Sequence, residues 1–84
     1  MILSAELSLY PLREDYIPVI QAFIDELGER SDLTVVTNAM STQLRGEYAV
    51  VMEAVSDTLR HSAERFGEQV LVCKFIPLDL AIEG

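Results

Sequence analysis

A strict alternation of side-chain type over residues 2–10 constrains the fold more than any other feature of the chain. Every odd position is apolar: Leu3, Ala5, Leu7 and Leu9. The even positions hold the other set: Ile2, Ser4, Glu6, Ser8 and Tyr10. Successive side chains of a β-strand point to opposite faces, so this segment is predicted to be a strand with one face on a core. The remaining segments must supply the cover for that face.

Two segments have the helical spacing that such a cover needs. Apolar residues recur at helical intervals in the first segment: Tyr16, Ile20, Phe23, Ile24 and Leu27. We expect Asp15 to cap this helix, Pro18 to lie in its first turn and Gly28 to end it. The second segment is expected to begin after Gly46 and to end at Gly67. One stripe runs along it: Tyr48, Val51, Met52, Val55, Leu59, Ser62 and Phe66.

Three further strands complete the pattern. The run "LTVVTNA" (33–39) is rich in β-branched residues, and "MSTQL" (40–44) follows almost directly, so the two predict a short hairpin near Asn38 and Ala39. Gly46 is expected to break the second of these strands. "QVLVCKFI" (69–76) predicts the last strand, before Pro77 and a short acidic tail. The register of the hairpin stays open, so either Ser41 and Gln43 or Thr42 faces away from the helices.

The order β-α-β-β-α-β predicts an α+β fold of the ferredoxin-like βαββαβ type. In it a four-stranded antiparallel sheet carries two helices on one face, and residues 1–84 form a single domain. The first and last strands are neighbours in this topology, so Glu6 is expected opposite Lys74. In the predicted last strand, the side chains expected to point toward the helices are Leu71, Cys73 and Phe75. The face of the sheet without helices, the open face, is expected to receive the others: Val70, Val72, Lys74 and Ile76.

Composition narrows the classes of function. Half of the residues are hydrophobic, which allows a core without metal or disulfides, and the single cysteine, Cys73, is predicted to be a small core residue. Fourteen acids against six bases give a net charge of −8, which argues against binding nucleic acid. No apolar run approaches the roughly 18–20 residues that span a membrane. The first residues lack the features of a secretion signal, so we expect a cytoplasmic protein without membrane insertion.

The predicted open face would expose a sizeable apolar patch, and such a patch usually has a partner. One explanation is a homodimer or higher homo-oligomer formed through the sheet face. Another is a small-molecule pocket beside that face, because such pockets are apolar with a few convergent polar groups. The two explanations are compatible.

Three stretches of the chain are informative together: "LSLYPLREDYIPVIQAFIDEL" (7–27), "VVTNAMSTQLRGEYAVVMEAV" (35–55) and "VLVCKF" (70–75). They resemble the YkoF-like thiamine/hydroxymethylpyrimidine-binding family. The resemblance implies ferredoxin-like domains that associate through their sheets and bind thiamine or its pyrimidine precursor. It also implies thiamine-related transporter components as partners. The proteins that give the family its name carry two such domains in tandem, so here two copies of the chain would form the interface.

The candidate ligand-binding residues are mostly uncharged and polar: Glu6, Ser8, Tyr10, Asn38, Ser41, Thr42, Gln43 and Tyr48. Glu6 suits the amino group or the positive charge of thiamine, hydroxyls and amides suit the ring edge, and tyrosines suit stacking. Most of them have an alternative role, which for Ser41, Thr42 and Gln43 is that of strand residues on a polar interface. Glu6 could pair across strands with Lys74, Asn38 could be a turn residue, and the tyrosines could pack at the rim.

A catalytic role is not expected. Acylphosphatases share the predicted fold. After their first strand they have a glycine-rich anion-binding loop that contains an arginine. Here "YPLREDY" offers Arg13 without a glycine and with two acids beside it, which repel phosphate. No nucleophile–base pair or metal-ligand spacing appears elsewhere. We therefore predict a non-catalytic binding protein without a metal or cofactor, and keep as alternative an ACT-like oligomerisation module without this ligand.

Overall fold

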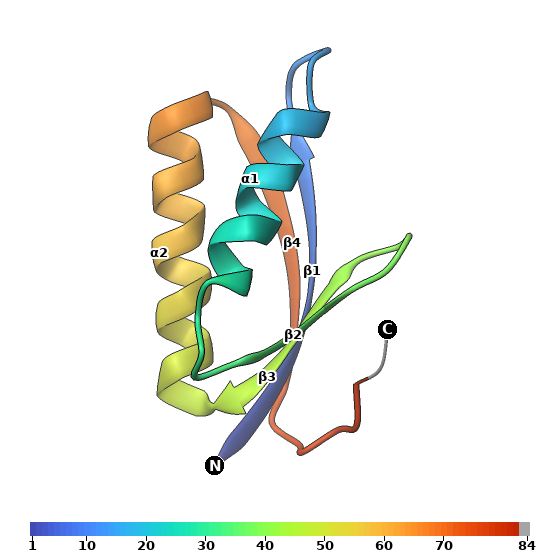
Figure 1. Ribbon diagram of the computed structural model, residues 1–84, viewed down its shortest axis with the longest axis vertical. Helices are drawn as coiled ribbons and strands as arrows, with labels where there is room; N and C mark the ends of the chain where they lie inside the picture. Colours follow the sequence, from blue (N-terminus) through green and yellow to red (C-terminus); the bar gives the residue numbers. More distant parts are fainter. Residues whose placement is uncertain (83–84) are drawn as a thin grey trace.

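The computed structural model describes residues 1–82 and has the predicted ferredoxin-like α+β fold (Figure 1). Its elements follow one another as β1 (Ile2–Pro11), α1 (Ile17–Gly28), β2 (Thr34–Thr37), β3 (Thr42–Glu47), α2 (Tyr48–Phe66) and β4 (Gln69–Ile76). The strands form one antiparallel sheet in the order β2-β3-β1-β4. Both helices cover the same face of this sheet (Figure 1). We call the other face the open face.

The alternation in β1 places its odd side chains in the core, as predicted. Leu3, Ala5 and Leu7 are each less than 5% exposed, whereas Leu9 is only partly buried. The helices and β3 supply the other buried residues of this core: Phe23, Leu27, Leu44, Val51, Ala54 and Val55. Burial of each large apolar side chain contributes about 1.5–3 kcal/mol. The core therefore forms along β1, one of the two inner strands of the sheet.

The buried stripe of α2 differs from the predicted stripe both at its start and in its middle. Ala54 and Thr58 are buried, but Tyr48 is 43% exposed. Tyr48 is the first residue of the helix, so its side chain projects at the end of the molecule and not over the sheet.

The first helix begins later than predicted. Its N-cap is Tyr16, which makes no side-chain cap bond, and the Tyr16 carbonyl accepts a bond from the N–H of Ile20. Asp15 therefore lies one residue outside the cap position, and its carboxylate is 4.0 Å from the Arg13 guanidinium. Pro18 lies in the first turn and the helix ends at Gly28, as predicted.

The hairpin strands also have different bounds from those predicted. β2 is shorter than 33–39 because the turn starts at Asn38, and β3 starts at Thr42 because the Asn38 side chain takes the N–H groups of Met40 and Ser41. At its other end β3 continues through Gly46, which pairs with Leu3. The predicted strand break at Gly46 is therefore wrong. Glycine fits this position because Leu33 and the Asp32 carbonyl pack closely against it.

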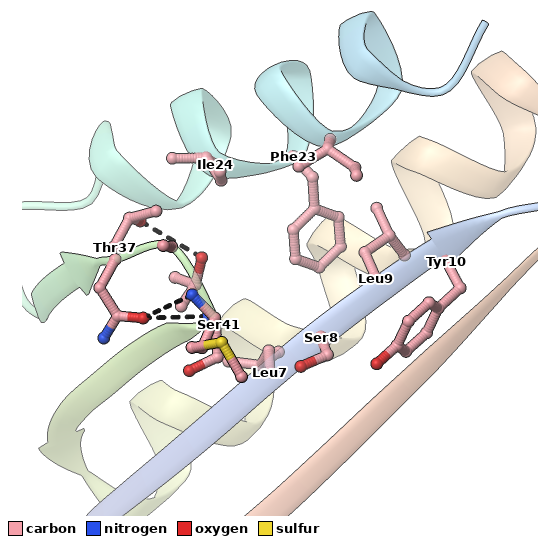
Figure 2. Close-up of a pocket in the computed structure, with 13 residues that line it drawn as sticks. Leu7, Ser8, Leu9, Tyr10, Phe23, Ile24, Thr37 and Ser41 are labelled. Carbon is pink, nitrogen blue, oxygen red and sulfur yellow. Dashed lines mark hydrogen bonds between the residues drawn. The ribbon is translucent and has the colours of Figure 1, made fainter.

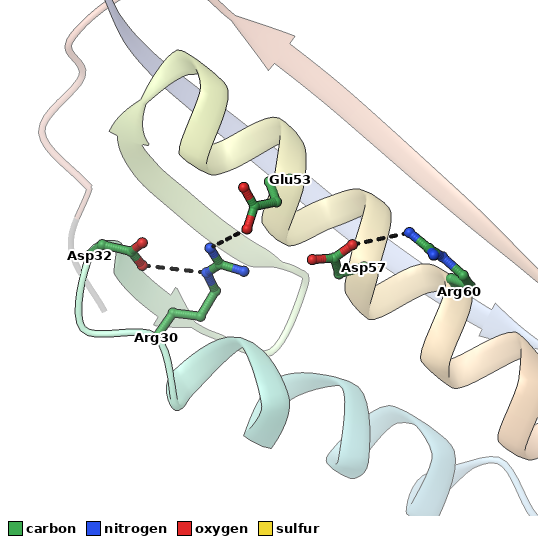
Figure 3. Close-up of polar contacts among 5 residues, drawn as sticks. All are labelled: Arg30, Asp32, Glu53, Asp57 and Arg60. Atoms are coloured by element: carbon green, nitrogen blue, oxygen red, sulfur yellow. Dashed lines mark hydrogen bonds and ion pairs between the residues drawn. The ribbon is translucent and has the colours of Figure 1, made fainter.

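Ion pairs hold the α1–β2 connection against α2 (Figure 3). The Arg30 guanidinium lies 3.3 Å from the Asp32 carboxylate and 3.4 Å from that of Glu53. The hydrogen bond to Asp32 raises the pKa of Arg30. A separate pair joins Arg60 to Asp57 along α2 at 3.1 Å. Exposed pairs of this kind contribute about 0–1 kcal/mol each, so the apolar core dominates stability.

Residues 77–82 cross part of the open face on the side away from the helices (Figure 1). Ser4 Oγ donates to the Leu78 carbonyl at 2.8 Å and accepts from the Leu80 N–H at 3.2 Å. Asp79 pairs with Arg45. Ser4 points to the open face as predicted, yet it is only 2% exposed because this segment covers it. Glu83 of the predicted acidic tail lies outside the described residues.

Neither α1 nor α2 combines the length and the apolar character that crossing a bilayer requires, and the described chain contains no other helix.

Gly46→Val is expected to lower the free energy of unfolding by about 1–3 kcal/mol, measured by urea denaturation. A Cβ at this position would lie 2.7 Å from Leu33 Cδ2 and 3.3 Å from the Asp32 carbonyl oxygen. Gly28→Ala is the control, because a Cβ there has no heavy atom within 4 Å. The control should leave stability unchanged or raise it by up to about 1 kcal/mol. Equal losses in both variants would contradict the packing explanation.

Candidate functional site

The register of the sheet decides which polar side chains face which side. Leu7 pairs with Thr42 and Glu6 with Gln43. Since Leu7 points into the core, Thr42 points to the helix side, where it is 6% exposed, and Gln43 points to the open face. Ser41 also reaches the open side, because its hydroxyl bonds to Glu6. The first of the two predicted registers is therefore the one present.

A cavity of about 180 Å³ lies between α1, β1 and the β2–β3 turn, and we call it the hairpin cavity. Figure 2 shows how three elements form it: Phe23 and Ile24 come from α1, the residues from Leu7 to Tyr10 come from β1, and Thr37 and Ser41 come from the hairpin. An apolar cavity of about 150 Å³ holds a ring the size of benzene. The hairpin cavity therefore has room for one aromatic ring.

The cavity exists because β1 is longer than the strand beside it. β3 pairs with β1 only as far as Leu7, whereas β4 pairs with it as far as Pro11. Along Ser8–Tyr10, the edge of β1 that would face β3 has no neighbouring strand. Phe23, which is 4% exposed, packs over this region from α1.

Uncharged polar groups line the hairpin side of the cavity. The hydroxyls of Thr37 and Thr42 are 3.2 Å apart and hydrogen-bonded to each other. Only one of the two O–H groups is used in that bond, so the other remains able to donate. Asn38 Oδ1 accepts from the N–H of Met40 at 2.9 Å and from that of Ser41 at 3.1 Å. Asn38 therefore fills the turn role named as its alternative, with its amide nitrogen left for other partners.

A charged group adjoins the cavity on the open face. Glu6 Oε2 accepts from Ser41 Oγ at 3.1 Å, and Glu6 Oε1 lies 3.6 Å from Lys74 Nζ. The expected pairing of Glu6 with Lys74 is therefore present. Glu6, Gln43 and Lys74 line a second hollow of about 330 Å³ beneath residues 80–82. Ser41 connects the two hollows, since it lines the first and bonds to the acid of the second.

The structure brings together seven of the eight predicted site residues. The hairpin cavity is lined by five of them: Ser8, Tyr10, Asn38, Ser41 and Thr42. Glu6 and Gln43 line the adjoining hollow. Tyr48 is remote from both, because it follows β3 at the opposite end from the turn and its N–H donates to the Met1 carbonyl.

Sequence reasoning missed the wall that α1 contributes. Ile20, Phe23 and Ile24 line the cavity, although their helical spacing predicts only core positions. Thr37 was also missed. The alternation in β2 is the signal that could have found it, since Thr37 shares a face with Val35, which packs against the core.

The lining of the cavity offers hydrogen-bonding groups and apolar side chains. Among the described residues, its side chains include hydroxyls and an amide but no histidine, cysteine or carboxylate that could act as a general base. Cys73 lies opposite Leu7 and not in the cavity lining. Burial raises the pKa of the Cys73 thiol, which reduces its thiolate fraction at neutral pH.

Known proteins share both the sequence pattern and the fold. The model of the YKOF-related family matches residues 2–76. A Streptococcus pneumoniae protein superposes with a TM-score of 0.84 at 24% identity, covering 90% of this chain and 86% of its own. A Thermotoga maritima protein with a proposed role in thiamine biosynthesis or salvage gives 0.80 at 18% identity, covering 89% and 82%. A Methanocaldococcus jannascii protein gives 0.78 at 25% identity, covering 89% and 78%.

The search of curated proteins found no match. The two structures below 25% identity establish the fold alone, whereas the family model covers most of the chain. The chain therefore belongs to the YKOF-related family.

Proposed function

We propose that this protein binds thiamine or its hydroxymethylpyrimidine precursor without chemical conversion. The observation that carries this proposal is the hairpin cavity, which has the size of one aromatic ring and is lined by apolar side chains and uncharged hydrogen-bonding groups. Family membership supports it, as does the proposed role of the Thermotoga neighbour in thiamine metabolism.

The aminopyrimidine ring fits the chemistry of the cavity. Its faces are apolar and suit contact with Phe23 and Leu9, while its edge carries an amino group and ring nitrogens. The free hydroxyl of the Thr37–Thr42 pair and the Asn38 amide supply partners for that edge. A ring without these groups would not form these hydrogen bonds, which is the basis of selectivity.

The charge of the Glu6 carboxylate is complementary to the thiazolium ring of thiamine. The thiazolium ring carries a permanent positive charge, and the Glu6 carboxylate lies just past Ser41, on the side of the cavity that opens to the sheet face. The net charge of −8 adds a general attraction for a cation. Hydroxymethylpyrimidine lacks this charge and would use only the cavity.

A second copy of the chain is proposed to cover the exposed part of the open face. Tyr10 pairs with Val70 and Ser8 with Val72 across β1 and β4, and these three large side chains are 46–56% exposed: Tyr10, Val70 and Val72. They form an apolar patch beside the hairpin cavity, where residues 77–82 do not reach. A cytoplasmic location and thiamine-related transporter components as partners remain part of this proposal.

Calorimetric titration is expected to show saturable binding of thiamine or hydroxymethylpyrimidine, and saturation should raise the melting temperature. Ligand at a hundred times Kd contributes about 2.7 kcal/mol to stability. Thr37→Phe should abolish binding by filling the cavity from β2. Thr34→Phe is the matched control, since Thr34 lies on the same strand, is exposed like Thr37 and does not line the cavity.

Absence of any thermal shift at millimolar ligand would reject the proposal in favour of the ACT-like module. Equal weakening by Thr37→Phe and Thr34→Phe would move the site away from the cavity.

Glu6→Gln should weaken thiamine about tenfold or more and hydroxymethylpyrimidine much less, because only thiamine carries the permanent charge. The free energy of unfolding should change by less than about 1 kcal/mol, since the Glu6–Lys74 pair is partly exposed. Loss of stability with unchanged binding of both compounds would show that Glu6 has a structural role only.

Val72→Asp is expected to convert a homodimer to monomer in light-scattering measurements, because it places a charge in the apolar patch. Glu68→Asp lies just before the same strand and serves as a control that changes no charge. A wild-type chain that stays monomeric at millimolar concentration would contradict the proposed interface.

A further inference from the structure

Among the described residues 1–82, the main chain of β1 presents an unpaired hydrogen-bonding edge to the hairpin cavity. Residues of an antiparallel strand direct their N–H and C=O groups alternately toward one neighbour and the other. Two bonds at the ends of β1 reveal which residues face which neighbour. The Tyr48 N–H donates to the Met1 carbonyl at 2.9 Å on the β3 side, and the Leu12 N–H donates to the Glu68 carbonyl at 3.1 Å on the β4 side.

Odd residues of β1 therefore bond toward β3, and even residues bond toward β4. Leu7 is the last odd residue with a partner in β3, namely Thr42. Leu9 comes next, so its N–H and C=O both point to the side that β3 has vacated. Leu9 also lines the hairpin cavity.

Asn38 keeps this edge open. Continuing the β1–β3 register by two residues would place Met40 opposite Leu9. The Met40 N–H instead donates to Asn38 Oδ1 at 2.9 Å, and the Ser41 N–H donates to the same oxygen at 3.1 Å. The side chain of Asn38 thus takes the donor that would otherwise extend the ladder to Leu9.

The free groups of Leu9 form a donor and an acceptor side by side on one strand edge. An amino group next to a ring nitrogen presents the complementary pair, because the amino N–H donates and the ring nitrogen accepts. We propose that the N–H and C=O of Leu9 bind the amino-substituted edge of a nitrogen heterocycle, and that Asn38 is the positioning residue that holds this strand edge open. This inference rests on the proposed function and names the group that would recognise its ligand.

Amide exchange by NMR on the labelled full chain tests the inference, with hydroxymethylpyrimidine as the probe. In the free protein the Leu9 amide should exchange at least about tenfold faster than the Leu7 amide, since only Leu7 is in the β3 ladder. Saturating hydroxymethylpyrimidine should slow Leu9 exchange at least about tenfold and shift its resonance. The analogue with hydrogen in place of the amino group should bind about ten- to a hundredfold more weakly.

Two variants test the role of Asn38. Asn38→Ala should weaken hydroxymethylpyrimidine and slow Leu9 exchange in the free protein, because Met40 becomes free to pair with Leu9. Asn38→Asp retains the accepting oxygen and should keep fast Leu9 exchange. If Asn38→Ala does not fold, the wild-type exchange pattern still decides the inference.

The outcomes separate this inference from the proposed function. Saturable binding that leaves the Leu9 amide unchanged would overturn the inference and leave the function standing. Slow Leu9 exchange in the free protein would also overturn it, because the edge would then be occupied. Failure of hydroxymethylpyrimidine to bind would overturn the inference, and failure of both hydroxymethylpyrimidine and thiamine to bind would also overturn the proposed function.

Discussion

The central strand β1 extends beyond its partner β3, and the candidate site depends on this difference in length. From Ser4 to Leu7, β1 has neighbours on both sides, and the odd side chains of β1 up to Leu7 are buried under the two helices. Past Leu7 only β4 continues, and the same strand lines a cavity while Leu9 still packs against the edge of the core. Stability and the site thus use different ends of one strand. A change at Leu3 would act on folding, whereas a change near Leu9 would act first on the cavity.

The residues of the β2–β3 turn determine the chemical character of the cavity that this difference in length leaves. Asn38 folds the hairpin back before it can pair further with β1, and the Thr37–Thr42 hydroxyl pair closes the end of the ladder. The resulting cavity has an apolar floor from α1 and uncharged hydrogen-bonding groups on its hairpin wall. The charged Glu6 carboxylate lies at the border of the cavity, where it accepts a hydrogen bond from Ser41. The proposed ligand, a neutral heteroaromatic ring with a cationic extension, matches this environment better than a phosphate or a metal ion would.

Periodicity was sufficient to predict the architecture, since the alternation in residues 2–10 and the two helical stripes leave one common arrangement. The details that shape the site were harder to predict because they depend on contacts between distant residues. Asn38 has equal local reasons to be a turn residue or a ligand contact, and Gly46 resembles a strand breaker although it accommodates Leu33. Two contacts depend on tertiary packing that no single segment reveals. Residues 77–82 cover Ser4, and Phe23 forms part of the cavity wall. The residue type of Tyr48 predicts a ligand contact, but its position at the start of α2 places it at the other end of β3.

A crystal structure of the protein soaked with hydroxymethylpyrimidine tests the central claim most directly. The account predicts the ring in the hairpin cavity, against Phe23, with its amino edge toward Leu9 and the hydroxyls of the turn. A ring bound only beside Lys74 beneath residues 80–82, or at no defined position at saturating concentration, would contradict it.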